Sequence, residues 1–239
     1  MFFPFPMEFH SFPSTPYIWD GQKRRQEKQL SQEETERLLT KELLVQEKID
    51  GTNIGICFDE EEMILFQHRG DYIRTEEKEY QKLRQWCNRH REDLETILGT
   101  RKILFGEWML QKHTIFYDRL PSYFLAFDLF DREENKFVSQ ESLALSLKET
   151  SIYLLPLLYK GTMASLSDLQ NLLGKSHFGS ESMEGVYLRI DSGEWNEERA
   201  KYVLPSFHQS IKKHWKKQER VLNYSMDPIE KHWSNLIRS

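Results

Sequence analysis

The stretch Glu47-Lys48-Ile49-Asp50-Gly51-Thr52-Asn53 places a lysine in a short polar loop between two apolar segments. Leu43-Leu44-Val45 precedes it and Ile54-Gly55-Ile56-Cys57-Phe58 follows it, and both have the composition of short buried strands. A lysine at such a junction is held by rigid neighbours, so its amine can be desolvated and act as a nucleophile. The stretch is equally compatible with a solvated lysine beside an ordinary Asp-Gly hairpin turn.

The composition of the chain is typical of a globular protein. It has 239 residues, of which 30% are charged and 13% aromatic, and this length suits either one large domain or a domain with a small appendage. The sequence contains no apolar run of membrane-spanning length, and we expect no secretion leader because residues 1–6 lack a basic start and an unbroken apolar region. Cys57 and Cys87 are expected to be buried free thiols. We therefore expect a soluble, cytoplasmic protein without a membrane partner, and a monomer.

The net charge of −5 argues mildly against non-specific binding of nucleic acid, unless the basic residues are segregated. They are partly segregated, because residues 208–220 form a basic segment with helical spacing. Lys212, Lys216 and Arg220 lie on one face of the predicted helix. This face is either a contact surface for a phosphate backbone or a solvated side of an amphipathic helix.

Sequence patterns predict an α+β fold with a largely antiparallel sheet. Ser31 and Glu34 form a capping box for a helix over 32–41, and Gly99 is expected to end a helix over 76–98. Further helices are expected over 139–149 and 165–173, with two more after residue 207, the last one starting at Asp227-Pro228. The expected strands are 43–47, 53–58, 63–68, 103–105, 123–127, 152–159, 183–190 and 200–204. Residues 1–20 are expected to wrap along the core of a domain spanning 1–207, and 208–239 to form a short helical extension.

Several charged residues stand at the ends of predicted strands, beside glycine or aromatic residues. They are Arg69 before Gly70, Glu107 before Trp108, Asp128, Glu184 before Gly185, and Lys201. One such residue alone is usually a solvated strand terminus. The ordered set, with Lys48 ahead of it, carries more information.

In this order the residues resemble the motif series of the covalent nucleotidyltransferases, which include ATP-dependent DNA ligases, RNA ligases and mRNA capping enzymes. The matching segments are Glu47–Gly51, Arg69-Gly70, Phe105–Trp108, Phe124–Asp128, Glu184–Arg189 and Lys201–Val203. With Thr52-Asn53 included, the first segment looks most like the RNA ligase 2-like branch. The resemblance covers about residues 43–207. It implies a nucleotidyltransferase (ATP-grasp-like ligase) domain with its sheets around an ATP cleft, and the roughly 30 residues after Phe207 are too few for an OB-fold domain.

The resemblance also implies a reaction. Lys48 would attack the α-phosphate of ATP, AMP would pass to an RNA 5′-phosphate, and that end would be joined to a 3′-OH. A free lysine has a pKa of about 10.4, so only about one in 10³ is neutral at pH 7 and the site has to favour the amine. Lys201 is the implied second lysine, near enough to disfavour the Lys48 ammonium and to contact the α-phosphate.

The remaining roles are implied in the same way. Two divalent ions, Mg²⁺ or Mn²⁺, would bind with Glu184 as the main carboxylate and Glu107 in an outer position or at the ribose. Phe127 would stack on adenine. Three further residues would contact the nucleotide: Glu47 at the adenine amine, Arg69 at the ribose or a phosphate, and Asn53 at the ribose or the 3′-OH end.

One departure from the family pattern leaves two registers open. Ligases often have a Lys-x-Lys pair in the last motif, and here the pair is either Lys201 with Val203 or Arg199 with Lys201. The spacing to Phe207 favours the first, and Arg189 either replaces the missing cation or is a solvated strand residue. The alternative functions are a DNA ligase-like or capping-type nucleotidyltransferase and a catalytically decayed RNA-end-binding protein.

Overall fold

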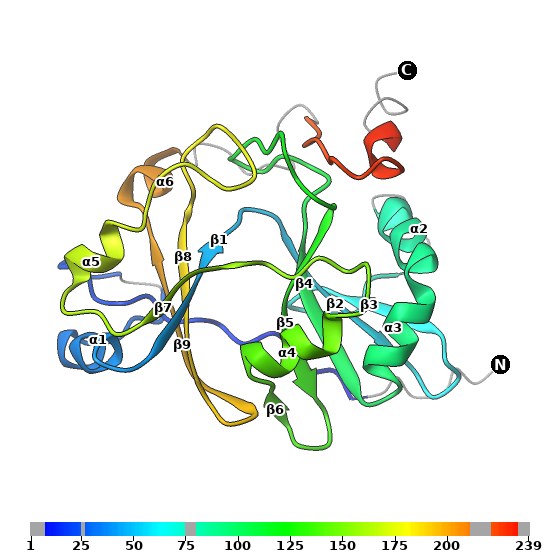
Figure 1. The fold of residues 1–239 in the computed structure, drawn as a ribbon, viewed down its shortest axis with the longest axis horizontal. Coiled ribbons are helices and arrows are strands. Elements are labelled where there is room, and N and C mark those ends of the chain that lie inside the picture. The colour runs from blue at the N-terminus through cyan, green and yellow to red at the C-terminus, as the bar shows by residue number, and fades with distance from the viewer. Residues whose placement is uncertain (1–7, 25–26, 75–79, 211–220, 234–239) are drawn as a thin grey trace. The chain divides into compact units, whose positions relative to one another are not determined.

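The computed structural model describes residues 8–24, 27–74, 80–210 and 221–233, with the backbone alone for 208–210. The chain forms two compact units, shown as ribbons in Figure 1. The first unit comprises the residues up to Pro13, Thr52–Trp108 and Phe124–Leu154. The second comprises Ser14–Gly51, Met109–Tyr123 and the residues from Leu155 onward. The division between Gly51 and Thr52 falls inside the lysine-containing stretch, so that Lys48 belongs to the second unit and Asn53 to the first.

The first unit is built on a five-stranded sheet in the order β3-β2-β4-β5-β6, with every neighbouring pair antiparallel. Its strands are β2 (Thr52–Phe58), β3 (Ile64–Gln67), β4 (Lys102–Trp108), β5 (Phe124–Asp131) and β6 (Lys136–Phe137). The acidic stretch Asp59-Glu60-Glu61-Glu62 predicts a turn between the strands expected over 53–58 and 63–68, and β2 and β3 do pair across it as a hairpin. Asp59 closes it, because its Oδ1 accepts the backbone N–H groups of Glu61 at 3.0 Å and Met63 at 2.8 Å.

The prediction of a single helix over 76–98 is wrong, because α2 (Gln81–Arg89) and α3 (Arg91–Leu98) are separate helices. Residues 75–79 lie outside the described residues. The break is at His90, with φ −102° and ψ 19°. Its buried ring packs on Trp86 at 4.2 Å between centroids, and its Nδ1 lies 2.8 Å from the Ser151 hydroxyl. Helical periodicity cannot register these tertiary contacts. Gly99 ends α3 as predicted, with φ 48°.

The second unit is built on a four-stranded antiparallel sheet in the order β7-β1-β8-β9. Its strands are β1 (Leu43–Lys48), β7 (Leu157–Gly161), β8 (Gly185–Ser192) and β9 (Trp195–Val203). One face of this sheet packs with α1 (Gln32–Leu39) and α5 (Leu166–Gln170) around an apolar core that includes Leu38, Leu43, Val45, Leu169, Val186, Leu188, Ala200 and Tyr202. Because side chains alternate along a strand, the opposite face carries Lys48 and Lys201.

Helix boundaries follow local capping chemistry closely. α1 starts at the predicted capping box, in which Ser31 and Glu34 exchange hydrogen bonds. α4 (Gln140–Leu147) starts after Ser139, whose hydroxyl accepts the Ser142 N–H. Asp227 Oδ1 accepts the N–H groups of Ile229 and Glu230 as a cap would, but the 3₁₀ helix η3 (Glu230–His232) starts three residues after the predicted N-cap.

Strand boundaries differ more. β9 begins at Trp195 rather than at the predicted residue 200, and its charged first half pairs with β8 across a turn at Gly193, where φ is 56°. Glu198 in that half binds Arg37 and Lys41 of the α1 region, a long-range contact that sequence periodicity does not reveal. Of the helix predicted over 208–220, residues 208–210 belong to α6 (Pro205–Ser210), and 211–220 lie outside the described residues.

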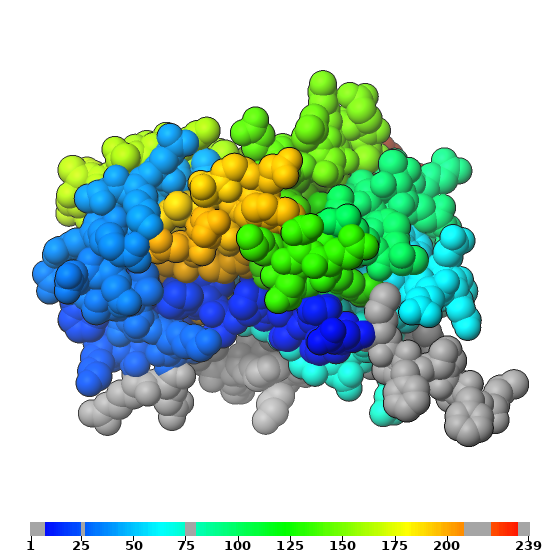
Figure 2. Space-filling view, turned by 90° about the horizontal axis from the view of Figure 1, so that it is seen from below, coloured from blue at the N-terminus to red at the C-terminus, as the bar shows by residue number. Residues whose placement is uncertain are grey.

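The segment after residue 7 is visible as a dark blue band at the surface in Figure 2. It nevertheless buries side chains in both units: Phe12 contacts Phe105 and Phe127 in the first, and Tyr17 and Ile18 are buried in the second. Within the described ranges, no helix is both long and apolar enough to cross a membrane.

The β5–β6 hairpin of the first unit yields a stability prediction. Arg101 Nε lies 2.9 and 2.8 Å from the two oxygens of the buried Asp131 carboxylate, and the N–H groups of Glu133 and Glu134 also donate to it. Burial alone would raise the pKa of Asp131, but these hydrogen bonds bring it below its ordinary value. The carboxylate therefore stabilises the fold above its unfolded pKa, and this contribution is lost as the pH falls through the folded value.

Asp131→Asn is expected to lower the free energy of unfolding by about 1–2 kcal/mol at pH 7, and the difference is expected to be smaller at an acidic pH below the ordinary Asp pKa of about 3.9. Urea unfolding at both pH values measures it. Glu133→Gln is the matched control, since Glu133 also contacts Arg101 but is 68% exposed, and little change is expected there. An equal loss in both variants would contradict the assignment.

Candidate functional site

The second unit joins the first and fifth of the sequence motifs through an ion pair. Lys48 ends β1, Glu184 immediately precedes β8, and the strand register pairs Lys48 with Gly185. The Nζ of Lys48 lies 2.8 Å from Oε2 of Glu184, and the two side chains are 26% and 9% exposed. Burial raises the pKa of the Glu184 carboxyl; the Lys48 cation opposes that rise and the Asp50 carboxylate adds to it. The nucleophile candidate is thus held by a nearly buried carboxylate.

Lys201 approaches the same group from β9. It lies opposite Tyr187, two pairs along from the pair of Val203 and Gly185, and therefore on the sheet face that carries Lys48. Its charge acts on Glu184 in the direction that lowers the carboxyl pKa. Its Nζ stands 4.1 Å from the centroid of the Tyr17 ring. The structure therefore brings Lys48, Glu184 and Lys201 together, as their motif order predicted.

The loop after Lys48 is held by contacts that the sequence analysis missed. Asp50 Oδ2 accepts the backbone N–H groups of Thr114 at 2.7 Å and Ile115 at 3.1 Å. The Asp50 N–H donates to the hydroxyl of Tyr117, which is fully buried, and burial raises the pKa of that phenol well above its ordinary value. Asn223 in turn accepts the Tyr117 N–H at 2.9 Å. Asp50 stood inside the first motif, but nothing in the sequence pointed to Tyr117 or Asn223.

Glu47 neighbours Lys48 but points to the other face of β1. It is 2% exposed, and its Oε2 accepts the backbone N–H of His177 at 3.0 Å. Its Oε1 is buried without a hydrogen-bond partner among the described residues. A buried acceptor of this kind can take a proton from a ligand amine.

The first unit carries the other predicted nucleotide contacts. Asn53 of β2 lies directly opposite Glu107 of β4, and the Asn53 Oδ1 is buried without a hydrogen-bond partner in the described part of the chain. Phe127 is the extra residue of a bulge in β5, because Phe105 pairs with Asp128 and Gly106 with Ala126. Phe127 is 9% exposed, and its ring meets the Phe12 ring edge-on with 5.4 Å between the centroids.

Arg69 lies beyond the end of β3 with an exposed side chain, and its carbonyl accepts a hydrogen bond from the Ser11 hydroxyl at 2.6 Å. Its predicted nucleotide contact stays a prediction. Lys212, Lys216 and Arg220 lie outside the described residues, so their predicted role toward nucleic acid is untested as well.

The cations of β8 and β9 correct one expectation. Arg189 is not a solvated strand residue: it is fully buried, and its Nη2 lies 3.3 Å from Asp191 Oδ1. Arg199 donates to Asn196 Oδ1 at 2.9 and 2.6 Å. Arg199, Lys201 and Val203 share one face of β9, so both registers of the last motif remain open.

A divalent metal fits one part of this site. Among the described residues no group of three His, Cys, Asp or Glu side chains could enclose an ion. Mg²⁺, however, keeps several waters and needs only one or two carboxylates besides phosphate oxygens. The buried Glu184 carboxylate, with the Asp50 charge acting on it, meets that requirement.

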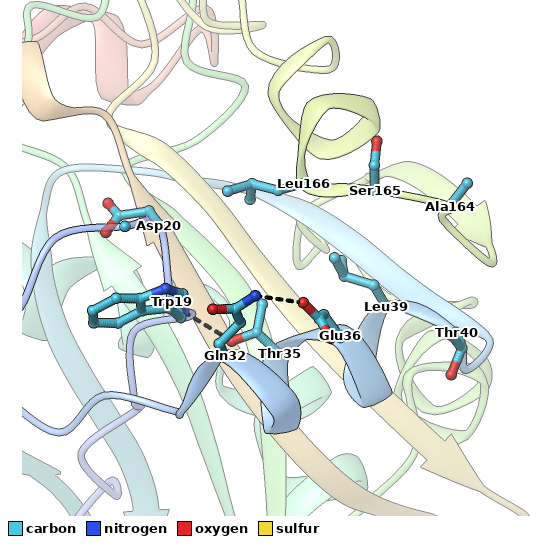
Figure 3. A pocket seen from close by; sticks show the side chains of 11 residues that line it. Trp19, Asp20, Gln32, Thr35, Glu36, Leu39, Thr40, Ala164, Ser165 and Leu166 are labelled. Atoms are coloured by element: carbon cyan, nitrogen blue, oxygen red, sulfur yellow. Dashed lines mark hydrogen bonds between the residues drawn. The ribbon is translucent and has the colours of Figure 1, made fainter.

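A separate cavity of about 650 Å³ opens in the second unit, between α1, residues 19–21 and residues 164–166 (Figure 3). Trp19 and Leu166 line it, and Gln32 donates to Glu36 at 2.8 Å along its wall. None of the motif residues lines this cavity.

Solved structures identify the fold. Naegleria gruberi RNA ligase with PPi matches with a TM-score of 0.60 and 18% identity, over 74% of this chain and 53% of that chain. A mutant of the same ligase with ATP and Mn matches with a TM-score of 0.57 and 15% identity, over 74% of this chain and 54% of that chain. Another mutant with AMP and Mn matches with a TM-score of 0.55 and 16% identity, over 73% of this chain and 53% of that chain. The chain thus spans about half of the length of these ligases, and its fold is a mixed α/β fold with antiparallel sheets similar to theirs.

The family follows from the sequence match. A family model described as RNA ligase matches residues 41–203, the region that contains every motif up to Val203. The chain belongs to the RNA ligase family. A comparison with curated proteins gives no match.

The glycine after Glu184 yields a second prediction. A Cβ at Gly185 would lie 2.0 Å from the Tyr202 carbonyl oxygen and 2.8 Å from Val203 Cα, so β9 would have to move. Gly185→Ala is expected to destabilise the protein by about 2 kcal/mol or more. At Gly174 a Cβ meets nothing within 4 Å, and Gly174→Ala is expected to be neutral or slightly stabilising. Thermal unfolding of both variants measures this difference, and equal melting temperatures would contradict it.

Proposed function

We propose that this protein is an ATP-dependent RNA ligase that adenylylates itself on Lys48, transfers AMP to a 5′-phosphate end and seals that end to a 3′-OH. The observation that carries the proposal is the grouping of Lys48, Glu184 and Lys201 on one sheet of the second unit. A nucleophilic amine, a buried carboxylate and a second cation are the parts that phosphoryl chemistry at a lysine requires.

In the first step, the Lys48 amine forms a bond to the α-phosphorus of ATP and the bond to the bridging oxygen of pyrophosphate breaks. Because Lys48 starts as the cation of its ion pair with Glu184, its ammonium first gives up one proton and the attacking amine then releases a second one to solvent. Pyrophosphate leaves with the bonding pair. Glu184 holds Lys48 Nζ at the end of β1 and thereby limits its conformations. The Lys201 ammonium offsets negative charge that develops on the α-phosphate.

A bound Mg²⁺ or Mn²⁺ would neutralise charge on the phosphates. In the proposal Glu184 would be the main carboxylate for this ion, and Glu107 would supply an outer contact or a ribose contact. Structures of similar ligases with ATP, AMP and Mn support a nucleotide and a divalent ion as ligands.

Base and ribose recognition are proposed for the remaining residues. The buried Glu47 Oε1, without a hydrogen-bond partner in the described part of the chain, suits the adenine amine, and the similarly placed Asn53 Oδ1 suits a ribose hydroxyl or the 3′-OH end. Phe127 offers an aromatic face for the base, and Arg69 a cation for the ribose or a phosphate.

The later steps use the stored AMP. An RNA 5′-phosphate oxygen attacks the adenylate phosphorus, the P–N bond to Lys48 breaks, and a 5′–5′ pyrophosphate forms. The 3′-OH of the second end then attacks the 5′-phosphate and AMP leaves, which completes a phosphodiester. We include Lys212, Lys216 and Arg220 in the proposal as contacts to the RNA backbone, since each can neutralise one phosphate.

The decisive test is covalent labelling. Incubation with α-labelled ATP and Mg²⁺ or Mn²⁺ is expected to label the wild-type polypeptide, and Lys48→Arg is expected to abolish the label. Arginine keeps a cation beside Glu184 but is always protonated and cannot act as the nucleophile. Lys48→Ala should also fail, but it leaves a buried carboxylate without this partner, so its folding has to be checked by thermal unfolding.

The matched control is Lys160→Ala, because Lys160 is a 60% exposed lysine of the neighbouring strand β7 and should label like wild type. Absence of an adduct with ATP under either metal would refute the proposal. Label from GTP only would indicate a capping-type enzyme, and label that persists in Lys48→Arg would show that another residue is the nucleophile.

Sealing assays separate the remaining alternatives. Nicked duplexes with 5′-phosphate and 3′-OH RNA ends are expected to be joined faster than all-DNA nicks, and a 5′-OH end should not be joined. Gel separation of the joined strand measures this. Faster sealing of DNA would favour a DNA ligase, whereas binding of RNA ends without adduct or sealing would indicate an end-binding protein.

A further inference from the structure

Tyr17 meets the second lysine of the site from a segment that carries no nucleotidyltransferase motif. We propose that Tyr17 is a positioning residue that fixes the Lys201 side chain by holding its backbone and its ammonium group at once. The proposal rests on the proposed function, because Lys201 has to contact ATP for its position to affect the reaction rate.

The backbone of Lys201 is held on both sides of Tyr17. The Lys201 N–H donates to the Pro16 carbonyl at 2.9 Å, and the Ile18 N–H donates to the Lys201 carbonyl at 2.9 Å. Residues 16–18 thus add a short parallel strand to β9 at this point. Tyr17 itself is anchored from its other edge, since its N–H and carbonyl bond to Lys28 and Leu30, each at 2.8 Å.

The ring of Tyr17 holds the other end of the lysine. Lys201 Nζ stands 4.1 Å from the ring centroid, well within the range of a cation–π contact. The Arg24 guanidinium carbon lies 4.5 Å from the same centroid, and only 6% of Tyr17 is exposed. A cation–π contact is strongest where it is shielded from water, which this burial provides.

Fixing both ends of Lys201 has a chemical consequence. A lysine side chain has four rotatable bonds, so an unrestrained ammonium group occupies many positions. Lys48 is restrained by Glu184, and Tyr17 supplies the corresponding restraint for Lys201. A preorganised cation can stabilise transition-state charge without reorganising at the moment of reaction.

The test compares two substitutions of Tyr17 with wild type. Tyr17→Phe retains the aromatic face, whereas Tyr17→Leu keeps an apolar side chain of moderate size and removes the face. At saturating ATP, the single-turnover rate of lysyl-AMP formation is expected to stay within about twofold for Phe and to fall about tenfold for Leu, with a smaller change in KM for ATP. If only the Tyr17 hydroxyl mattered, Tyr17→Phe would slow lysyl-AMP formation as much as Tyr17→Leu does.

Two controls separate positioning from general destabilisation. Leu38→Val removes buried volume from the core of the same unit and should lower the melting temperature without slowing adduct formation. A double-mutant cycle of Tyr17→Leu and Lys201→Leu, measured by urea unfolding, should show that the two losses are not additive. The cycle tests the contact even if no variant has activity.

The outcomes are distinguishable. Equal rates for wild type and Tyr17→Leu, equal slowing in Phe and Leu, or additive stability losses would overturn the role of Tyr17. Slowing of Leu38→Val to the same degree would assign the effect to stability and also overturn it. Absence of adduct in wild type itself would instead refute the proposed function, while the cycle would still decide on the contact.

Discussion

The antiparallel pairing of β1 with β8 is the constraint on which the rest of the second unit depends. It sets Lys48 opposite Gly185, so that Glu184 stands within 2.8 Å of the lysine Nζ. A shift of one residue in this register would turn Lys48 into the apolar core and expose Val45 and Leu43 instead. The burial of that core therefore fixes the position of the ion pair, since a slip would cost several buried side chains.

The loop that follows Lys48 is held in place by residues that are distant from it in the sequence. Asp50 binds the backbone at Thr114 and Ile115, and Tyr117 binds Asp50 and is itself held by Asn223. Asn223 therefore supports the loop that follows the nucleophile through Tyr117 and Asp50. The Tyr17 segment serves Lys201 in a comparable way. Both sets of supporting residues act through hydrogen bonds and ring contacts that carry no signature in the sequence.

Local chemistry explains which predictions of structure succeeded. The capping box at Ser31, the Asp59 turn and the Gly99 stop were predicted because neighbouring residues alone satisfy their backbone groups. The failures occur where distant residues intervene. The helix over 76–98 breaks where His90 meets Ser151, and β9 extends because β8 pairs with its charged half and Glu198 binds Arg37. The sequence left two alternatives open for Arg189, because its burial beside Asp191 depends on how the strand packs.

The sequence by itself determined the order and type of the reactive residues, because motif spacing follows from strand and loop lengths that the chain encodes locally. It therefore placed Lys48, Glu184 and Lys201 at the ends of predicted strands. Only the tertiary structure decided their neighbours: which face of the sheet they share, that Glu184 is nearly buried, and that the Tyr17 ring covers Lys201. These depend on strand register and long-range packing, which arise from the burial of side chains far apart in the chain.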